Sequence, residues 1–257
     1  MKLYDGMLEE IGAALSGREP RVFPYRADGS WPMSKDYEVV LQGDTAFELG
    51  GGKKHSANLT CVTGNKDYVG REGVYLYGSD LNEIKGATDY VRISVVLQSD
   101  AGMRRTDTAD NPGQLYNVIQ DIDAMKYHMY TKGFMMRTSG QSARETVRVS
   151  RRAVKDGISF AAVGNTLIKS YKKNPLVDSV KVIFVTGGEI DFGLLEKQAD
   201  QAIKIKNSLS VIQKELPTEC GSCTIREICG EVEGLRELHF GKKVRDGGAE
   251  NKIAVRV

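Results

Sequence analysis

The order in which strand-like and helix-like patterns follow one another constrains the fold of this chain most strongly. Between residues 18 and 100, short β-rich runs are separated by glycines, a texture that is typical of strands and hairpins. A further branched, alternating run follows later in the chain. These runs predict a mainly antiparallel or mixed sheet. The predicted strands are residues 37–41, 46–49, 58–63, 73–78, 91–97 and 177–186.

Amphipathic helix patterns occupy most of the remaining chain, because apolar residues there recur at a spacing of three and four. Glycine marks the expected end of two of these helices, at Gly17 and near Gly133, and Pro175 stops a third. The predicted helices are residues 3–16, 115–133, 160–171 and 191–213.

Strands that come first and helices that come later, in place of strict βαβ alternation, predict an α+β fold with helices packed on one face of the sheet. We divide the chain into an α+β domain, residues 1–214, and a cysteine-containing segment with a charged tail, residues 215–257. Residues 99–113 are polar and rich in turn formers, and we predict a surface loop there.

Charge and hydropathy exclude several classes of partner. The 36 basic and 34 acidic residues leave a net charge of +2, which does not support a nucleic-acid partner. Asp5, Glu9 and Glu10 interrupt the stretch in which a signal peptide needs an apolar run. No stretch approaches the roughly 18 apolar residues of a membrane span. We therefore expect a cytoplasmic protein that binds neither nucleic acid nor a membrane.

Three of the four cysteines form a C-x2-C-x5-C pattern as Cys220, Cys223 and Cys229. In a reducing compartment such a cluster indicates free thiols or metal ligands rather than disulfides. The two-residue gap lets a tight turn direct two thiolates at one metal centre. Thiolates select soft metals, so an iron–sulfur cluster and zinc are the candidate occupants.

A tetrahedral zinc site or a cubane needs a fourth ligand, which this triplet does not supply. Cys61, on a predicted strand, and His239, close to the triplet in sequence, are the two candidates. Free cysteine is among the most buried residue types, so Cys61 equally fits a small hydrophobic side chain in the core. We consider that second environment the more common one for a cysteine on a strand.

Several long segments resemble one family, the CO-methylating acetyl-CoA synthases, which form the beta subunit of the acetyl-CoA decarbonylase/synthase complex. The similar segments are YEVVLQGDTAFELGGG at 37–52, LYGSDLNEIKGATDYVRISVVL at 76–97 and VRVSRRAVKDGISFAAVGNTLIKSYKKNPLVDSVKVIFVT at 147–186. The resemblance covers nearly the whole chain and corresponds to the middle region of the family plus the start of its cluster-binding domain. It implies a role in anaerobic one-carbon metabolism.

The resemblance also assigns the cysteines. Cys220, Cys223 and Cys229 match the first three cysteines that hold a four-iron cubane in that family, which implies a 4Fe-4S cluster here. The chain then departs from the pattern. GEVEGLRELHFGK at 230–242 stands in place of the segment with the fourth cysteine, and the Cys-Gly-Cys loop that holds nickel in the family does not occur. A complete nickel site is therefore not expected.

Together these features predict an acetyl-CoA-synthase-like protein of one-carbon metabolism that binds an iron–sulfur cluster and docks a corrinoid protein or a CO dehydrogenase. The incomplete nickel ligand set predicts a truncated or accessory homologue and leaves open whether the chain is an enzyme. The alternative is a non-redox interaction module in which the three cysteines, with Cys61 or His239, hold a structural zinc ion.

Overall fold

The computed structural model describes residues 2–35, 38–102, 112–139, 141–187, 189–213 and 223–232, together with Leu235 and Leu238. The strands are β1 (Arg21–Pro24), β2 (Thr45–Leu49), β3 (Ser56–Thr63), β4 (Gly73–Gly78), β5 (Tyr90–Gln98), β6 (Phe134–Thr138), β7 (Glu145–Ser150) and β8 (Val177–Thr186). The α-helices are α1 (Asp5–Leu15), α2 (Lys66–Val69), α4 (Pro112–Ala124), α5 (Arg151–Lys155), α6 (Phe160–Tyr171), α7 (Phe192–Gln213) and α8 (Arg226–Glu231), and the 3-10 helices are η1 (Ala27–Gly29), η2 (Gln42–Asp44) and η3 (Met125–His128).

The larger of two sheets is mixed and has the strand order β1-β4-β8-β5-β3. β8 and β5 pair antiparallel at its centre, while β4 runs parallel to β8 and β3 runs parallel to β5. β3 and β5 are buried along their whole lengths. Both strands combine apolar and β-branched residues with buried polar side chains, among them Asn58 and Arg92, so both of their faces are covered.

The smaller sheet is antiparallel, with the order β2-β7-β6. β7 alternates buried and partly buried residues, because Val147 and Val149 face the core while Thr146 and Arg148 face outward. The two sheets join through main-chain contacts: the Asn58 N–H donates to the Ala143 carbonyl at 2.7 Å.

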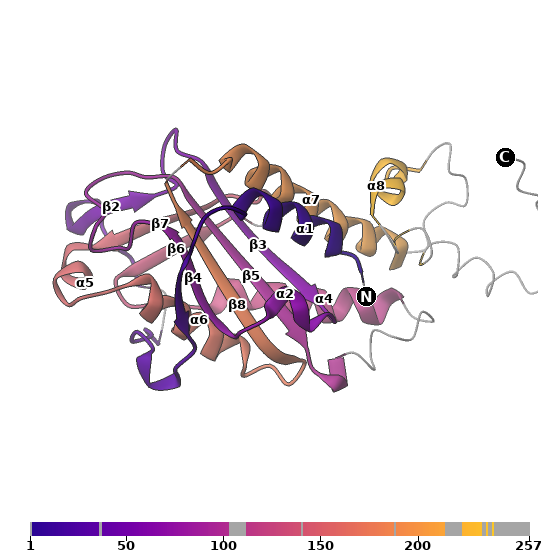
Figure 1. Ribbon diagram of the computed structural model, residues 1–257, viewed down its shortest axis with the longest axis horizontal. Helices are drawn as coiled ribbons and strands as arrows, with labels where there is room; N and C mark the ends of the chain where they lie inside the picture. Colours follow the sequence, from indigo (N-terminus) through magenta and orange to yellow (C-terminus); the bar gives the residue numbers. More distant parts are fainter. Residues whose placement is uncertain are drawn as a thin grey trace, which may run out of the picture.

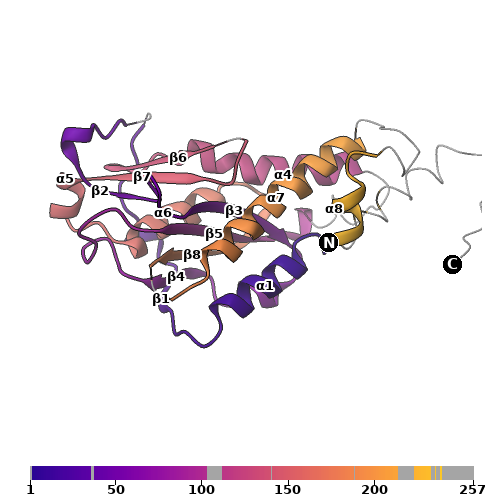
Figure 2. The same cartoon turned by 90° about the horizontal axis from the view of Figure 1, so that it is seen from above.

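Helices cover both faces of the larger sheet. Phe184 stands opposite Arg92, and Leu59 stands opposite Ile93, so Phe184 and Leu59 lie on different faces. Phe160 of α6 packs against Phe184, with ring centroids 4.5 Å apart. α7 contacts β3 and β5 from the other face. Figure 1 shows α1 and α7 above the sheet and α6 below it, and Figure 2 shows α7 crossing the strands.

The structure confirms the predicted α+β class with a mixed sheet, but it corrects three details. Helices pack on both faces of the larger sheet and not on one face. Residues 38–41 pair with no strand in the described part of the chain, because Val39 and Leu41 are exposed and the Val40 N–H donates to the Met135 sulfur. The helix predicted for 115–133 ends at Ala124 and continues as the 3-10 turn η3.

The predicted loop at residues 99–113 lies largely outside the described residues. No helix in the parts of the chain that the structure describes is both long enough and apolar enough to cross a membrane.

Candidate functional site

Two cysteines of the predicted metal site are described: Cys223 lies three residues before the start of α8, and Cys229 lies within that helix. The Cys223 carbonyl accepts a hydrogen bond from the Arg226 N–H at 3.2 Å, and Cys229 lies within α8, where its N–H donates to the Ile225 carbonyl at 2.9 Å. Both cysteine side chains are partly buried and pack against the main core. α8 and the turn that leads into it therefore hold two thiols against the body of the molecule.

α8 is anchored to α7 by apolar side chains. Ile225 and Ile228 are both 7% exposed and belong to the same core as the sheet strands. A groove of about 240 Å³ follows the contact between the two helices, with Lys204 and Val211 on the α7 side and Glu227 and Glu231 on the α8 side. The cysteine-bearing helix is thus part of the packed structure (Figure 1).

The other predicted ligands are not brought to α8 by the described residues. Cys220 and His239 lie outside these residues. Cys61 lies on β3, where it is fully buried, and burial together with the charge of Asp123 raises the pKa of its thiol to about 12. In the described residues no three His, Cys, Asp or Glu side chains come close enough to share a metal ion. The ligand set Cys220, Cys223 and Cys229 therefore stays a prediction.

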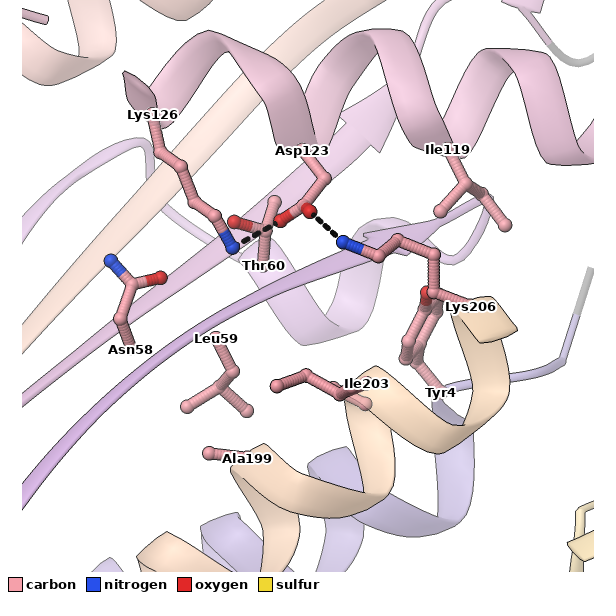
Figure 3. A pocket seen from close by; sticks show the side chains of 11 residues that line it. Tyr4, Asn58, Leu59, Thr60, Ile119, Asp123, Lys126, Ala199, Ile203 and Lys206 are labelled. Atoms are coloured by element: carbon pink, nitrogen blue, oxygen red, sulfur yellow. Dashed lines mark hydrogen bonds and ion pairs between the residues drawn. The ribbon is translucent and has the colours of Figure 1, made fainter. Parts of the chain in front are cut away.

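A second site was not predicted from the sequence and is shown in Figure 3. It is a small pocket with charged, polar and apolar lining residues, here called the Asp123 pocket, formed where α4 and α7 meet the edge strand β3. Its lining residues are Tyr4, Asn58, Leu59, Thr60, Ile119, Asp123, Lys126, Ala199, Ala202, Ile203 and Lys206.

Two lysines share one carboxylate in the Asp123 pocket. Lys126, one turn further along the same helical stretch, donates to Asp123 Oδ1 at 2.7 Å, and Lys206 of α7 donates to Asp123 Oδ2 at 2.7 Å. The side chains of Asp123 and Lys126 are 10% and 8% exposed, and that of Lys206 is 18% exposed. Burial alone would raise the pKa of Asp123, but the two ammonium groups outweigh it and lower that pKa.

The sequence contained one signal for this pocket. Asp123 follows Ile119 by four residues, so it lies on the apolar face of its helix, where a charged side chain needs a buried partner. The identity of that partner was not predictable, because Lys206 lies 83 residues further along the chain.

A third polar cluster joins the two sheets. Arg92 of β5 and Glu145 of β7 are both 0% exposed and form a two-pronged ion pair, with Nε–Oε1 at 2.8 Å and Nη2–Oε2 at 2.6 Å. Asn58 and Thr138 also donate to Glu145 Oε2, each at 2.5 Å. Burial opposes ionisation of Glu145, yet Arg92 and these donors lower the pKa of Glu145 below its ordinary value.

The three clusters differ in what they can do chemically. The Arg92–Glu145 pair is closed to solvent and serves to hold the two sheets together. The Asp123 pocket opens to solvent beside Lys206 and offers charged groups to a small ligand. α8 offers thiols, which can bind a soft metal once they are deprotonated.

Comparison with known families gives one match. Residues 32–190 match the family model described as the CO dehydrogenase/acetyl-CoA synthase complex beta subunit. This range covers more than half of the chain, runs from before β2 to just after β8, and includes Arg92, Asp123 and Glu145. A search of curated proteins found no significant match.

Proposed function

Because the chain belongs to the family of the CO dehydrogenase/acetyl-CoA synthase complex beta subunit, we propose that it acts as a cluster-binding component of acetyl-CoA-synthase-like one-carbon metabolism. In this role it binds a 4Fe-4S cluster through Cys220, Cys223 and Cys229 and docks a corrinoid protein or a CO dehydrogenase. We place this activity in the cytoplasm and under anaerobic conditions.

The spacing and placement of the cysteines support the assignment of an iron–sulfur cluster. The C-x2-C-x5-C pattern supplies three cysteines within ten residues, and two of them, Cys223 just before α8 and Cys229 within it, lie on a segment that packs against α7. An iron–sulfur cluster needs closely spaced thiolates on a segment that the fold holds in place. The partly buried positions of Cys223 and Cys229 support such a segment, since burial and hydrogen bonding tune a cluster.

A cubane held by these three thiolates has a fourth iron that needs its own ligand. Cys61 and His239 stay the candidates within this chain, and a thiolate from a partner is the third. The core position of Cys61 and the raised pKa of its thiol disfavour a metal-bound thiolate there. We include no nickel site, because the Cys-x-Cys pattern that would hold it does not occur in residues 1–257.

The cluster assignment is tested on protein purified without oxygen. We expect iron and acid-labile sulfide in equal amounts and a broad visible absorbance that fades on reduction. Single changes of Cys220, Cys223 or Cys229 to Ser should each lower the iron content severalfold, whereas Thr224→Ser, at an exposed position of the same segment, should not. Stoichiometric zinc without sulfide would instead establish the structural zinc alternative.

Partner docking needs an experiment of its own. The family description names a complex subunit, so we expect a stable association with a corrinoid protein or a CO dehydrogenase from the same cell. Size-exclusion chromatography of the cluster-loaded chain with each candidate should show a joint peak. Separate elution at micromolar concentrations with both candidates would contradict the docking role and leave the cluster assignment intact.

A further inference from the structure

The Asp123 pocket has no part in the proposed cluster chemistry, and its charges do not balance. Lys126 and Lys206 each donate to Asp123, so the residues that line the pocket hold two positive charges against one negative charge. Lys126 also lies 5.3 Å from the centroid of the Tyr127 ring, which does not neutralise it. A mostly buried site with one surplus positive charge is stabilised by an anion.

A second observation in the pocket points to a ligand. Asn58 is 3% exposed, and its Nδ2 donates to Glu145 Oε2, which fixes the orientation of the amide. Its Oδ1 has no hydrogen-bond partner in the described structure. Figure 3 shows this oxygen on the side of the amide that faces Lys126. A buried acceptor without a donor is unfavourable, so a ligand that brings an O–H or N–H group is favoured here.

The size of the pocket limits the occupant to a few atoms. The enclosed space is about 20 Å³ and opens outward beside Lys206. This space holds about one water-sized group, with any further atoms in the mouth. The enclosed part therefore takes one oxygen of a ligand, and the remaining atoms of that ligand lie in the mouth beside Lys206.

We propose that the Asp123 pocket binds a small monovalent oxyanion that carries one hydroxyl group, of which hydrogen carbonate is the simplest. Its charged oxygens accept hydrogen bonds from Lys126 and Lys206, and its O–H donates to Asn58 Oδ1. Water satisfies Asn58 but leaves the surplus charge, and chloride neutralises the charge but leaves the Asn58 acceptor without a donor. An oxyanion with a hydroxyl group does both.

Binding is measured on the full chain with ¹³C-labelled hydrogen carbonate, by the broadening of its carbon resonance, and by thermal unfolding in the same series. At equal ionic strength and pH, hydrogen carbonate should raise the unfolding midpoint more than formate, which lacks the hydroxyl, and formate more than chloride. Equal midpoints in the three salts, without line broadening, would mean that the pocket holds water only, and the proposal would be wrong.

Two lysine variants on α7 locate the site. Lys206→Met removes one charged donor and should weaken hydrogen carbonate binding by about tenfold or more, since a hydrogen bond to a charged group contributes about 1.5–3 kcal/mol. Lys204→Met changes the same charge at an exposed position of the same helix and should leave binding unchanged. Equal losses in both variants, or none in either, would overturn the assignment. If Lys206→Met does not fold, the order of the unfolding midpoints of the unmodified chain in the three salts decides whether the proposal holds.

Binding of an oxyanion in the Asp123 pocket does not require the iron–sulfur cluster. Its tests can be run on cluster-free protein, so the failure of one proposal does not affect the other.

Discussion

At the scale of single residues, Arg92 and Glu145 form an ion pair inside the core, where β5 of the larger sheet meets β7 of the smaller one. Arg92 and Glu145 are completely enclosed; Glu145 is compensated by Arg92 and by the donors Asn58 and Thr138, whereas Arg92 Nη1 has no hydrogen-bond partner in the described part of the chain. Breaking a buried pair by removing one partner is far more costly than removing a pair at the surface, because the remaining charge keeps its desolvation penalty.

We therefore expect Arg92→Met to lower the free energy of unfolding by about 3–5 kcal/mol, since Glu145 would stay buried without its cation. Urea denaturation followed by circular dichroism measures this change. Arg26→Met is the matched control, because Arg26 pairs with Asp28 on the surface with side chains that are 72% and 75% exposed. A similar shift of the urea midpoint in both variants would contradict the role of burial.

The same pair makes stability depend on pH. The folded-state pKa of Glu145 is lowered, so its stabilising contribution is present above the unfolded-state pKa of about 4.3 and is lost as the pH falls through the folded value. Glu145→Gln should therefore reduce stability at pH 7 and flatten its decline in acid. Urea midpoints of both proteins between pH 7 and pH 3 should converge as the pH falls. If the urea midpoints of the two proteins instead fell in parallel with pH, Glu145 would not contribute to the loss of stability in acid.

Cys61 should be chemically silent in the folded protein. With a thiol pKa of about 12, only about one molecule in ten thousand carries the thiolate at pH 8, and the side chain is also fully buried. We expect iodoacetamide to leave Cys61 unmodified in buffer and to modify it in urea, as measured by peptide mass spectrometry. Cys223, which is partly buried, serves as the reference thiol in cluster-free protein. Rapid modification of Cys61 by iodoacetamide in the folded protein would show that its thiol is not buried in the core.

At the scale of elements, close contact of α6 with the larger sheet depends on one glycine. A Cβ added at Gly164 would overlap both Cγ atoms of Val74 and approach the Phe184 ring. A small side chain is thus required where the helix crosses β4 and β8. Glycine is normally unfavourable inside a helix, so its presence in α6 reflects this contact.

Gly164→Ala should destabilise the protein by about 1–3 kcal/mol, because the overlap outweighs the gain in helix propensity. Gly12→Ala is the control: it lies within α1, with no atom within 4 Å of the added Cβ, and should be neutral or stabilising by up to about 1 kcal/mol. Both are measured by urea denaturation. A stabilised Gly164→Ala variant would mean that α6 and the sheet are further apart than described.

At the scale of the whole molecule, the two sheets and α8 share one core. Core residues from β5, β7 and α8 belong to the same contiguous cluster, which includes Ile93, Val147 and Ile228. Phe160 of α6 meets Phe134 of β6 edge-on at 6.4 Å, so the helix bridges both sheets. The smaller sheet is therefore part of the main body and not an independent unit.

One shared core predicts one unfolding transition. Trp31 is the single tryptophan of the chain. Its indole N–H donates to the carbonyl of Lys132, just before β6, and its main-chain N–H donates to the carbonyl of Ala162 in α6. Its fluorescence therefore reports on whether α6 and the start of β6 are still held together. We expect this signal and far-ultraviolet circular dichroism to change at the same guanidinium concentration. Separate midpoints would show that the smaller sheet unfolds on its own.

The sequence by itself determined the elements with a strong local period. The helices α1, α6 and α7 could be predicted because the spacing of their apolar residues records which side is buried. The strands β2, β3, β4, β5 and β8 could be predicted because apolar and β-branched residues concentrate in runs that turn residues separate. The family could also be recognised from these segments, and the family match confirms it. The strands β1, β6 and β7 were missed. β1 and β6 have only four or five residues with little alternation, whereas β7 alternates over six residues and its local signal was overlooked.

Only the tertiary structure decided which segments meet. The division into two sheets, the coverage of both faces of the larger one, and the meeting of Lys206 with Asp123 depend on contacts between residues far apart in the chain. A local pattern shows that a residue such as Arg92 or Asp123 is buried among apolar neighbours, but not which distant charge compensates it. That pairing is set by the packing of whole elements against one another, because a buried charge is stable only where the fold brings it a partner.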